Sequence, residues 1–221
     1  NPTLTTKTNV YGTCNILQAS RENNVKRVIY SSTSAAYGLK NDPPVREDMP
    51  NDCLNAYSIT KCAGEDLCKM FHSLYGMETV IFRYFNVYGE RQPTAGQYAP
   101  VIGLFFRQHK NGEPMTIVGD GNQRRDFTYI DDVVEANIKA ATTENEKVFG
   151  ETFNIGTGVD YNIHDLVKMV GGDDAKFINI PSRLAEIRES LSECAKAHEL
   201  LEWKPKTNLE EWITSCKQQL V

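Results

Sequence analysis

Segments with helical periodicity alternate with segments that read as strands along this chain. Apolar residues recur at helical spacing over residues 8–23, and the short apolar run RVIYSS follows at 27–32. The same order returns with a long helical pattern at 56–74 and a strand pattern at 79–84, before another helix at 98–110. Helices between strands are the connections that parallel strands require. The alternation therefore predicts an α/β fold built on a parallel sheet.

The second half of the chain carries shorter elements of both kinds. A turn at 119–122 is followed by a helical pattern at 130–141 and a strand at 152–155. Two further helices are expected at 192–201 and 208–219. This half is interpreted as a smaller α/β lobe.

Charge and hydropathy exclude several functional classes. The 24 basic and 29 acidic residues give a net charge of -5, so no overall basic field is available to hold nucleic acid. No apolar run approaches the ~18 residues that a membrane span needs, and we expect a cytoplasmic protein. The six cysteines are scattered, form no CxxC pair and match no histidine at ligand spacing, which argues against a metal site.

Tyr57 and Lys61 form a YxxxK pair in the helical pattern at 56–74. A spacing of four places both side chains on one face of a helix. An ammonium group beside a phenol favours the phenolate, which makes tyrosine a usable acid-base catalyst at neutral pH. The pair alone is a weak signal, because tyrosine and lysine meet at this spacing by chance in a chain of this composition.

Two strand patterns end in polar residues. The hydroxyl cluster Ser31–Ser34 closes the first strand, and the stretch from Val80 to Gly89, VIFRYFNVYG, ends in polar and aromatic residues. Catalytic groups in open α/β sheets lie at such carboxyl ends. We therefore expect the hydroxyls of the first strand to face a cleft. The plain alternative for the second stretch is a strand that runs into a polar loop.

At these positions the sequence resembles the extended short-chain dehydrogenase/reductase family, and within it the NAD-dependent nucleotide-sugar epimerases and dehydratases, above all the 4-epimerases of UDP-glucose and UDP-N-acetylglucosamine. The resemblance spans essentially the whole chain in family order. It rests on the segments NVYGTCNIL, VIYSSTSAAYG, AYSITKCAGE, FRYFNVYGERQ, GDGNQRRDFTYIDDV and FNIGTG.

The resemblance implies a Rossmann-like parallel sheet with a smaller α/β lobe for the substrate. Residues 1–88 would be the remainder of the NAD-binding domain, and 89–221 mainly the nucleotide-sugar lobe, with Rossmann elements interleaved near 130–155. The glycine loop of such a domain is expected upstream, because this chain opens directly into a helix. The GxG of FNIGTG is interpreted as a turn after a strand.

The resemblance also implies roles for individual residues. Tyr57 would exchange the proton of the sugar C4 hydroxyl, Lys61 would bind the nicotinamide ribose and lower the phenol pKa, and Thr33 would hydrogen-bond the same sugar oxygen. The implied NAD contacts are Lys61, Tyr57, Tyr84, Asn9 and Ser31. The implied contacts to the UDP-sugar are Thr33, Asn86, Arg125, Arg183, Glu186 and Ser190.

The residues after Thr33 bear on the reaction. Family dehydratases carry an Asp-Glu pair there and decarboxylases a glutamate, whereas this chain has Ser34 and Ala35. The resemblance therefore favours 4-epimerisation through a 4-keto sugar. The alternatives are a dehydratase or reductase of the same family, a 4-epimerase of uronic-acid sugars, and a nucleotide-sugar-binding fragment without activity.

Two further expectations follow from the resemblance. Ser190 falls where the family borders the C2 substituent of the sugar, and a serine would leave room for an acetamido group; alternatively it is an exposed polar residue before the next helix. A homodimer is expected through the helices at 8–23 and 56–74, as family members pair. Neither helix has an apolar stripe broad enough to establish this by itself.

Overall fold

The computed structural model describes residues 1–96, 99–182 and 187–220. Its first element is a long helix, made of α1 (Pro2–Thr6), a π-type stretch η1 (Lys7–Tyr11) and α2 (Gly12–Glu22). This helix begins six residues before the expected start at residue 8. The Asn1 side chain accepts a hydrogen bond from the Leu4 N–H, and proline is tolerated in the first turn of a helix.

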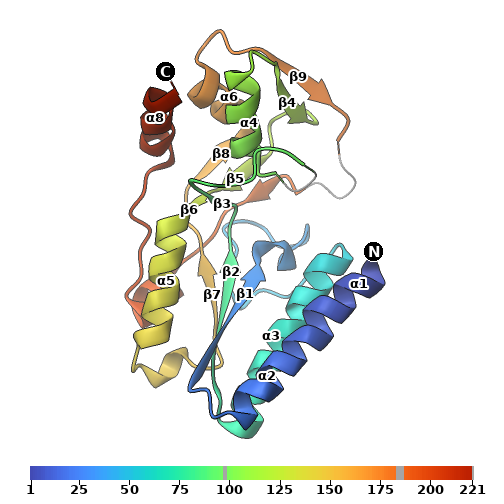
Figure 1. The fold of residues 1–221 in the computed structure, drawn as a ribbon, viewed down its shortest axis with the longest axis vertical. Coiled ribbons are helices and arrows are strands. Elements are labelled where there is room, and N and C mark those ends of the chain that lie inside the picture. The colour runs from blue at the N-terminus through green and yellow to red at the C-terminus, as the bar shows by residue number, and fades with distance from the viewer. Residues whose placement is uncertain (97–98, 183–186, 221) are drawn as a thin grey trace.

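Three parallel strands form the central sheet in the order β1, β2, β7 (Figure 1). They are β1 (Arg27–Thr33), β2 (Glu78–Tyr84) and β7 (Thr152–Ile155). Helices α2 and α3 (Ala56–Tyr75) cover one face, and α5 (Ile130–Thr142) covers the other. The parallel sheet predicted from the alternation is thus confirmed, because each crossover helix packs its apolar side on a face of the sheet.

The buried side chains follow these layers. The face under α2 and α3 holds Leu17, Cys68, Phe71, Met77 and Ile81. The opposite face holds a larger cluster from the strands, α5 and α7 (Ala195–Leu201), which includes Phe82, Phe153 and Trp203.

A second group of elements packs at the carboxyl end of the central sheet (Figure 1). Its helices are α4 (Val101–Lys110), α6 (Ile163–Gly171) and α8 (Leu209–Leu220). Its strands are β4 (Met115–Val118) paired with β9 (Phe177–Ile180), and β5 (Arg124–Asp126) between β8 (Asp160–Asn162) and β10 (Glu189–Ser190). Short strands β3 (Val87–Tyr88) and β6 (Thr128–Tyr129) pair with each other, and η2 (Ser34–Ala36) and η3 (Glu146–Val148) are single 3₁₀ turns.

Several sequence expectations for this half need correction. The helix expected from residue 98 begins at Val101, after Pro100, and the helix expected from residue 192 begins at Ala195. Ser192 instead forms a β-bridge with Val45 and hydrogen-bonds to Asp126, so it cannot enter a helix there. The strands β4, β5, β6, β8, β9 and β10 and the helix α6 were not predicted. The division at residue 88 stays a prediction.

Within the described ranges, no helix combines the length and hydropathy needed to cross a bilayer. The same residues contain no group of three or more His, Cys, Asp or Glu side chains arranged to hold a metal ion.

Candidate active site

Helix α3 starts at a capping box that fixes the position of the YxxxK pair. The Ser58 N–H donates to Asn55 Oδ1 at 3.0 Å, and the Asn55 N–H donates to Ser58 Oγ at 3.4 Å. These bonds satisfy two of the amide groups that a helix start leaves open. Tyr57 therefore lies in the first turn, where the residue is 48% exposed, and Lys61 follows one turn later.

The Lys61 ammonium lies above the ring of Tyr30, with Nζ 4.7 Å from the ring centroid. Burial lowers the pKa of Lys61, and the carboxylate of Glu65 opposes this shift. Burial also raises the pKa of Tyr30 to about 12, so that ring presents a neutral face to the ammonium. The cation thus lies against a side chain of β1, one helical turn after Tyr57.

The carboxyl ends of β1 and β2 bring three of the predicted residues together. Thr33 lies opposite Tyr84 in the parallel register, and Ser31 Oγ donates to the Tyr84 hydroxyl at 3.5 Å. Asn137 of α5 donates to the same hydroxyl at 3.0 Å. Thr33 Oγ1 accepts the Ala35 N–H at 3.2 Å and so caps the turn that follows β1. Hydroxyls from both strands therefore lie at this edge of the sheet, and their facing a substrate cleft stays a prediction.

Asn9 contacts α3 rather than a strand end. Its Nδ2 donates to Thr60 Oγ1 at 3.0 Å, and that hydroxyl donates to the Tyr57 carbonyl at 3.0 Å. The structure thus places Asn9 beside the turn of Tyr57, where its amide ties the first helix to α3.

A cavity of about 270 Å³ contains two of the residues predicted to contact the nucleotide sugar. Asn86 and Arg125 line it together with apolar residues that include Leu104, Val118 and Phe127. Asn86 adopts a left-handed backbone conformation with φ of 23°, and its Nδ2 donates to the Asp126 carbonyl at 2.7 Å. An exposed residue with a strained backbone, two positions after a sheet strand, is typical of binding sites.

Ser190 is the residue paired with Arg125 between β10 and β5. Strand register therefore brings Ser190 to the same lobe as the cavity. The two remaining predicted residues, Arg183 and Glu186, lie outside the described residues. A cavity with a guanidinium and an amide beside apolar walls suits an anionic ligand that also carries a flat, apolar part.

The sequence reasoning missed Asp126, a fully buried carboxylate. It accepts hydrogen bonds from the N–H and hydroxyl of Thr157, the N–H of Gly158, and the N–H and hydroxyl of Ser192. The signal was present in the motif RRDF, where Asp126 stands directly before Phe127 at the start of the segment FTYI.

The Asp126 contacts also determine whether the FNIGTG segment can bind a phosphate. Its amide groups at Thr157 and Gly158 point to Asp126, so they are not available to cradle a phosphate. A methyl group on Gly156 would overlap the Ser192 hydroxyl. The interpretation of this segment as a turn after a strand is confirmed, since β7 ends at Ile155.

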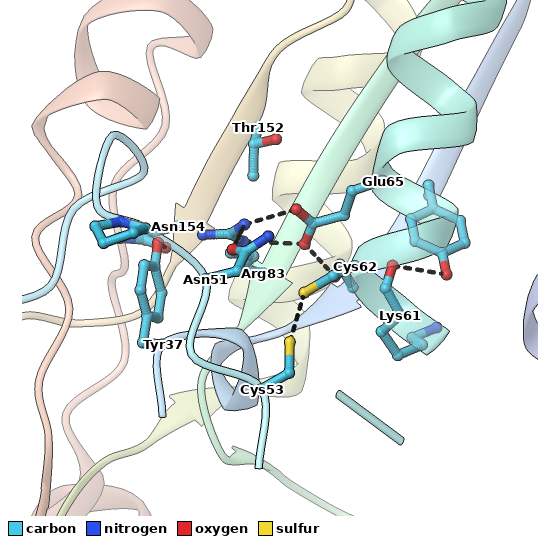
Figure 2. Close-up of polar contacts among 12 residues, drawn as sticks. Tyr37, Asn51, Cys53, Lys61, Cys62, Glu65, Arg83, Thr152 and Asn154 are labelled. Carbon is cyan, nitrogen blue, oxygen red and sulfur yellow. Dashed lines mark hydrogen bonds and ion pairs between the residues drawn. The ribbon is translucent and has the colours of Figure 1, made fainter. Parts of the chain in front are cut away.

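A second buried group was also missed, and Figure 2 shows its residues Glu65 and Arg83. Glu65 of α3 binds Arg83 of β2 through two contacts, and Ser32 of β1 donates to the same carboxylate. Ser32 and Arg83 each directly precede a residue of the strand-end group described above, Thr33 and Tyr84. The buried charges thus fix α3 against both strands.

The residues present fit the nicotinamide end of an NAD molecule. Lys61 supplies a half-buried cation on α3. At the ends of the adjacent strands, the hydroxyls of Ser31 and Tyr84 hydrogen-bond to each other. An ammonium group and hydroxyls can each hydrogen-bond the hydroxyls of a ribose, the part of NAD that carries the nicotinamide.

Comparison with known proteins identifies the family of this chain. The family model described as NAD dependent epimerase/dehydratase family matches residues 1–156. A putative UDP-glucose 4-epimerase of Methanocaldococcus jannaschii is 38% identical over 217 residues, which cover 96% of this chain and 69% of that protein.

Two solved structures are similar over nearly the whole chain. One is the UDP-glucose 4-epimerase of Thermotoga maritima with UDP-glucose, which has a TM-score of 0.91 and 34% sequence identity. The match covers 100% of this chain and 73% of the Thermotoga chain. The other is the UDP-glucuronic acid 4-epimerase of Bacillus cereus with UDP-glucuronic acid and NAD, which has a TM-score of 0.87 and 32% sequence identity. The match covers 97% of this chain and 68% of the Bacillus chain. By the extent of these matches, the chain belongs to the NAD-dependent epimerase/dehydratase family.

Proposed function

We propose that this protein interconverts the C4 epimers of a UDP-hexose, either UDP-glucose and UDP-galactose or their 2-acetamido counterparts. The observation that carries the proposal is the placement of Tyr57 and Lys61 on α3, which packs on the sheet whose strand end holds Thr33. Directly after Thr33, the positions where dehydratases of the family carry acid-base carboxylates hold Ser34 and Ala35 in a 3₁₀ turn.

Each residue has a defined task in this proposal. Tyr57 takes the proton from the C4 hydroxyl and later returns it, with Lys61 favouring the phenolate by its charge. Thr33 orients the same sugar oxygen by a hydrogen bond. Ser31 and Tyr84 would lie beside bound NAD, which would supply the hydride acceptor and donor for C4. Epimerisation requires the sugar to present its other face before the hydride returns.

The cavity with Asn86 and Arg125 would hold the nucleotide diphosphate. A guanidinium suits phosphate oxygens because it offers paired donors and a permanent charge. Support comes from the solved relatives, whose structures contain UDP-glucose and UDP-glucuronic acid. Arg183 and Glu186 stay predictions as contacts to phosphate and ribose.

A second candidate reaction is 4-epimerisation of a UDP-uronic acid. It is favoured by the likeness to the Bacillus cereus enzyme, whose structure contains UDP-glucuronic acid. The chemistry at C4 would be unchanged, and only the group on C5 would differ.

The test is turnover by the full gene product with NAD on UDP-glucose, UDP-N-acetylglucosamine and UDP-glucuronic acid, followed by NMR of the sugar protons. We expect C4 epimers from at least one of the two neutral sugars, with the same end mixture from either epimer. A 4-keto-6-deoxy product would identify a dehydratase. Binding of the UDP-sugar with no conversion would support the alternative of a binding fragment.

We also propose a homodimer formed by the first helix and α3. Support comes from exposed apolar side chains on these helices, with Leu4, Tyr11 and Ile16 on the first and Ile59 on α3. Sedimentation velocity tests it, and replacement of Ile16 by Glu should then yield monomers. A cytoplasmic location is part of the same proposal, to be checked by cell fractionation.

A further inference from the structure

Two cysteine thiols touch each other at the start of the helix that carries the YxxxK pair. Cys53 lies in the loop before α3 and Cys62 lies in its second turn, and their sulfur atoms are 3.3 Å apart (Figure 2). The Cys53 thiol donates to the Cys62 sulfur. Neither residue takes part in the function proposed above.

The loop holds Cys53 in this position from both sides. Asn51 Oδ1 accepts a hydrogen bond from Arg83 Nη2 at 2.8 Å, and the Asp52 N–H donates to the Ala36 carbonyl at 2.8 Å. On the other side, Asn55 caps α3. These bonds hold the backbone on both sides of Cys53 in place beside α3, so each thiol meets the other at a high effective concentration.

The two thiols differ in their access to solvent. Cys53 is half-buried, whereas Cys62 is 6% exposed. Burial raises the pKa of Cys62 to about 12, so it is mostly protonated in neutral solution. A reagent in solution therefore meets Cys53 first, and Cys62 is placed to react with whatever forms on Cys53.

We propose that Cys53 and Cys62 form a dithiol site that small-molecule disulfides of the glutathione type oxidise to an intramolecular disulfide. The Cys53 thiolate attacks one sulfur of the oxidant, which breaks its S–S bond and releases one thiolate. Cys62 then loses its proton and attacks Cys53, which releases the second thiolate. Two protein thiols lose two electrons and two protons, and one oxidant disulfide becomes two thiols.

Closing the bond would restrain the region that carries the YxxxK pair. The sulfur atoms must approach from 3.3 Å to about 2.05 Å, the length of a disulfide bond. The closed ring contains Asn55, Tyr57 and Lys61, so the cap and the first turn of α3 become tied to the loop. The site thereby couples the oxidation state of these two thiols to the mobility of Tyr57.

The test uses the whole purified chain, reduced and then equilibrated with oxidised glutathione, with no need for NAD or activity. Remaining thiols are blocked with N-ethylmaleimide before intact mass and peptide mapping. We expect loss of two hydrogen atoms, a linked pair of peptides containing Cys53 and Cys62, and four blocked cysteines of the six in the sequence. The linked form should exceed the glutathione adduct on Cys53 by about tenfold or more.

Single variants separate the role of Cys53, which reacts first with the oxidant, from that of Cys62, which then attacks Cys53. Cys62→Ser should accumulate a glutathione adduct on Cys53, whereas Cys53→Ser should leave Cys62 mostly unmodified because it is buried. Cys68→Ala, which alters a fully buried cysteine on the same helix, should keep the cross-link. Circular dichroism checks that each variant is folded.

Hydrogen exchange gives a second measurement on the wild-type chain. The amides of the first turn of α3 should exchange more slowly in the oxidised than in the reduced protein. The proposal is overturned if wild-type Cys53 keeps its glutathione adduct, if both cysteines are still blocked by N-ethylmaleimide, or if either bonds to a different cysteine.

Discussion

The guanidinium of Arg83 and the carboxylate of Glu65 form a doubly bonded ion pair inside the protein. Nε lies 2.9 Å from Oε1 and Nη2 lies 2.6 Å from Oε2, and the two side chains are 3% and 1% exposed. Because Arg83 belongs to β2 and Glu65 to α3, the pair sets how the helix of Tyr57 and Lys61 sits against the strand that ends at Tyr84. Two neighbours also hydrogen-bond to the pair: Ser32 donates to Glu65, and Asn51 accepts from Arg83.

Removing one of these charges should destabilise the fold strongly. Glu65→Gln leaves the Arg83 cation buried without its counter-charge, and we expect a loss of about 3–5 kcal/mol in the free energy of unfolding, measured with urea. Asp48→Asn, in the exposed pair with Arg46, should cost no more than about 1 kcal/mol. If the two variants lost similar amounts of unfolding free energy, the buried pair would contribute no more to stability than the exposed pair.

Replacing the proposed proton-transfer group should affect turnover and spare binding. Tyr57→Phe keeps the ring but lacks the hydroxyl, so we expect kcat to fall by about 10²–10⁴ while the Kd for the UDP-sugar changes little. Tyr11→Phe, at another exposed tyrosine, should leave kcat unchanged. Near-normal turnover in Tyr57→Phe would remove this residue from the chemistry.

Substrate size should depend on Ser190, which lies beside Arg125 in the strand pair of the nucleotide lobe. Ser190→Tyr should lower kcat/KM for 2-acetamido sugars by steric overlap and leave UDP-glucose and UDP-galactose as substrates. Ser190→Ala should accept both pairs. Equal losses on both pairs, or none on the acetamido pair, would exclude Ser190 as the determinant.

Gly156 should resist even the smallest substitution. A methyl group there meets the Ser192 hydroxyl and comes within 2.8 Å of Asp126 Oδ2, so Gly156→Ala should destabilise the protein by about 1–3 kcal/mol or more. Gly12→Ala is the matched control, because its nearest neighbour is the Lys7 carbonyl at 3.8 Å within a helix. That variant should gain up to about 1 kcal/mol. Thermal melts of the two variants should move in opposite directions.

Glu47 should make stability depend on pH in the mildly acidic range. Burial raises the pKa of Glu47 above its ordinary value of 4.5, although its carboxylate accepts the Asn154 N–H at 2.7 Å. The folded state therefore holds this proton more tightly than the unfolded state, and the charged form weakens the fold as pH rises through the raised pKa.

Glu47→Gln removes that ionisation and keeps an oxygen acceptor for Asn154. The free energy of unfolding of the variant minus that of the wild type should increase from about pH 4.5 upward and then level off. A series of urea titrations across this range measures the difference. A difference that does not change with pH would contradict the role given to Glu47.

The sequence by itself determined the local elements and the identity of the chemical groups. Apolar spacing specified the helices and strands of the first half, because a helix or strand must bury one face and its period is visible in the chain. The Tyr57 and Lys61 pair was recognisable for the same reason, since four residues always bring two side chains to one side of a helix. Short elements such as β8 and β10 gave no such signal, because two or three residues show no period.

Tertiary structure alone decided which distant residues meet. Asp126 lies 31 residues before Thr157 and 66 before Ser192, yet it binds both. The contacts of Glu65 with Ser32 and Arg83 likewise depend on how a helix crosses two strands. Such meetings are set by strand register and helix packing, which are properties of the whole assembled core, and no local run of residues encodes them.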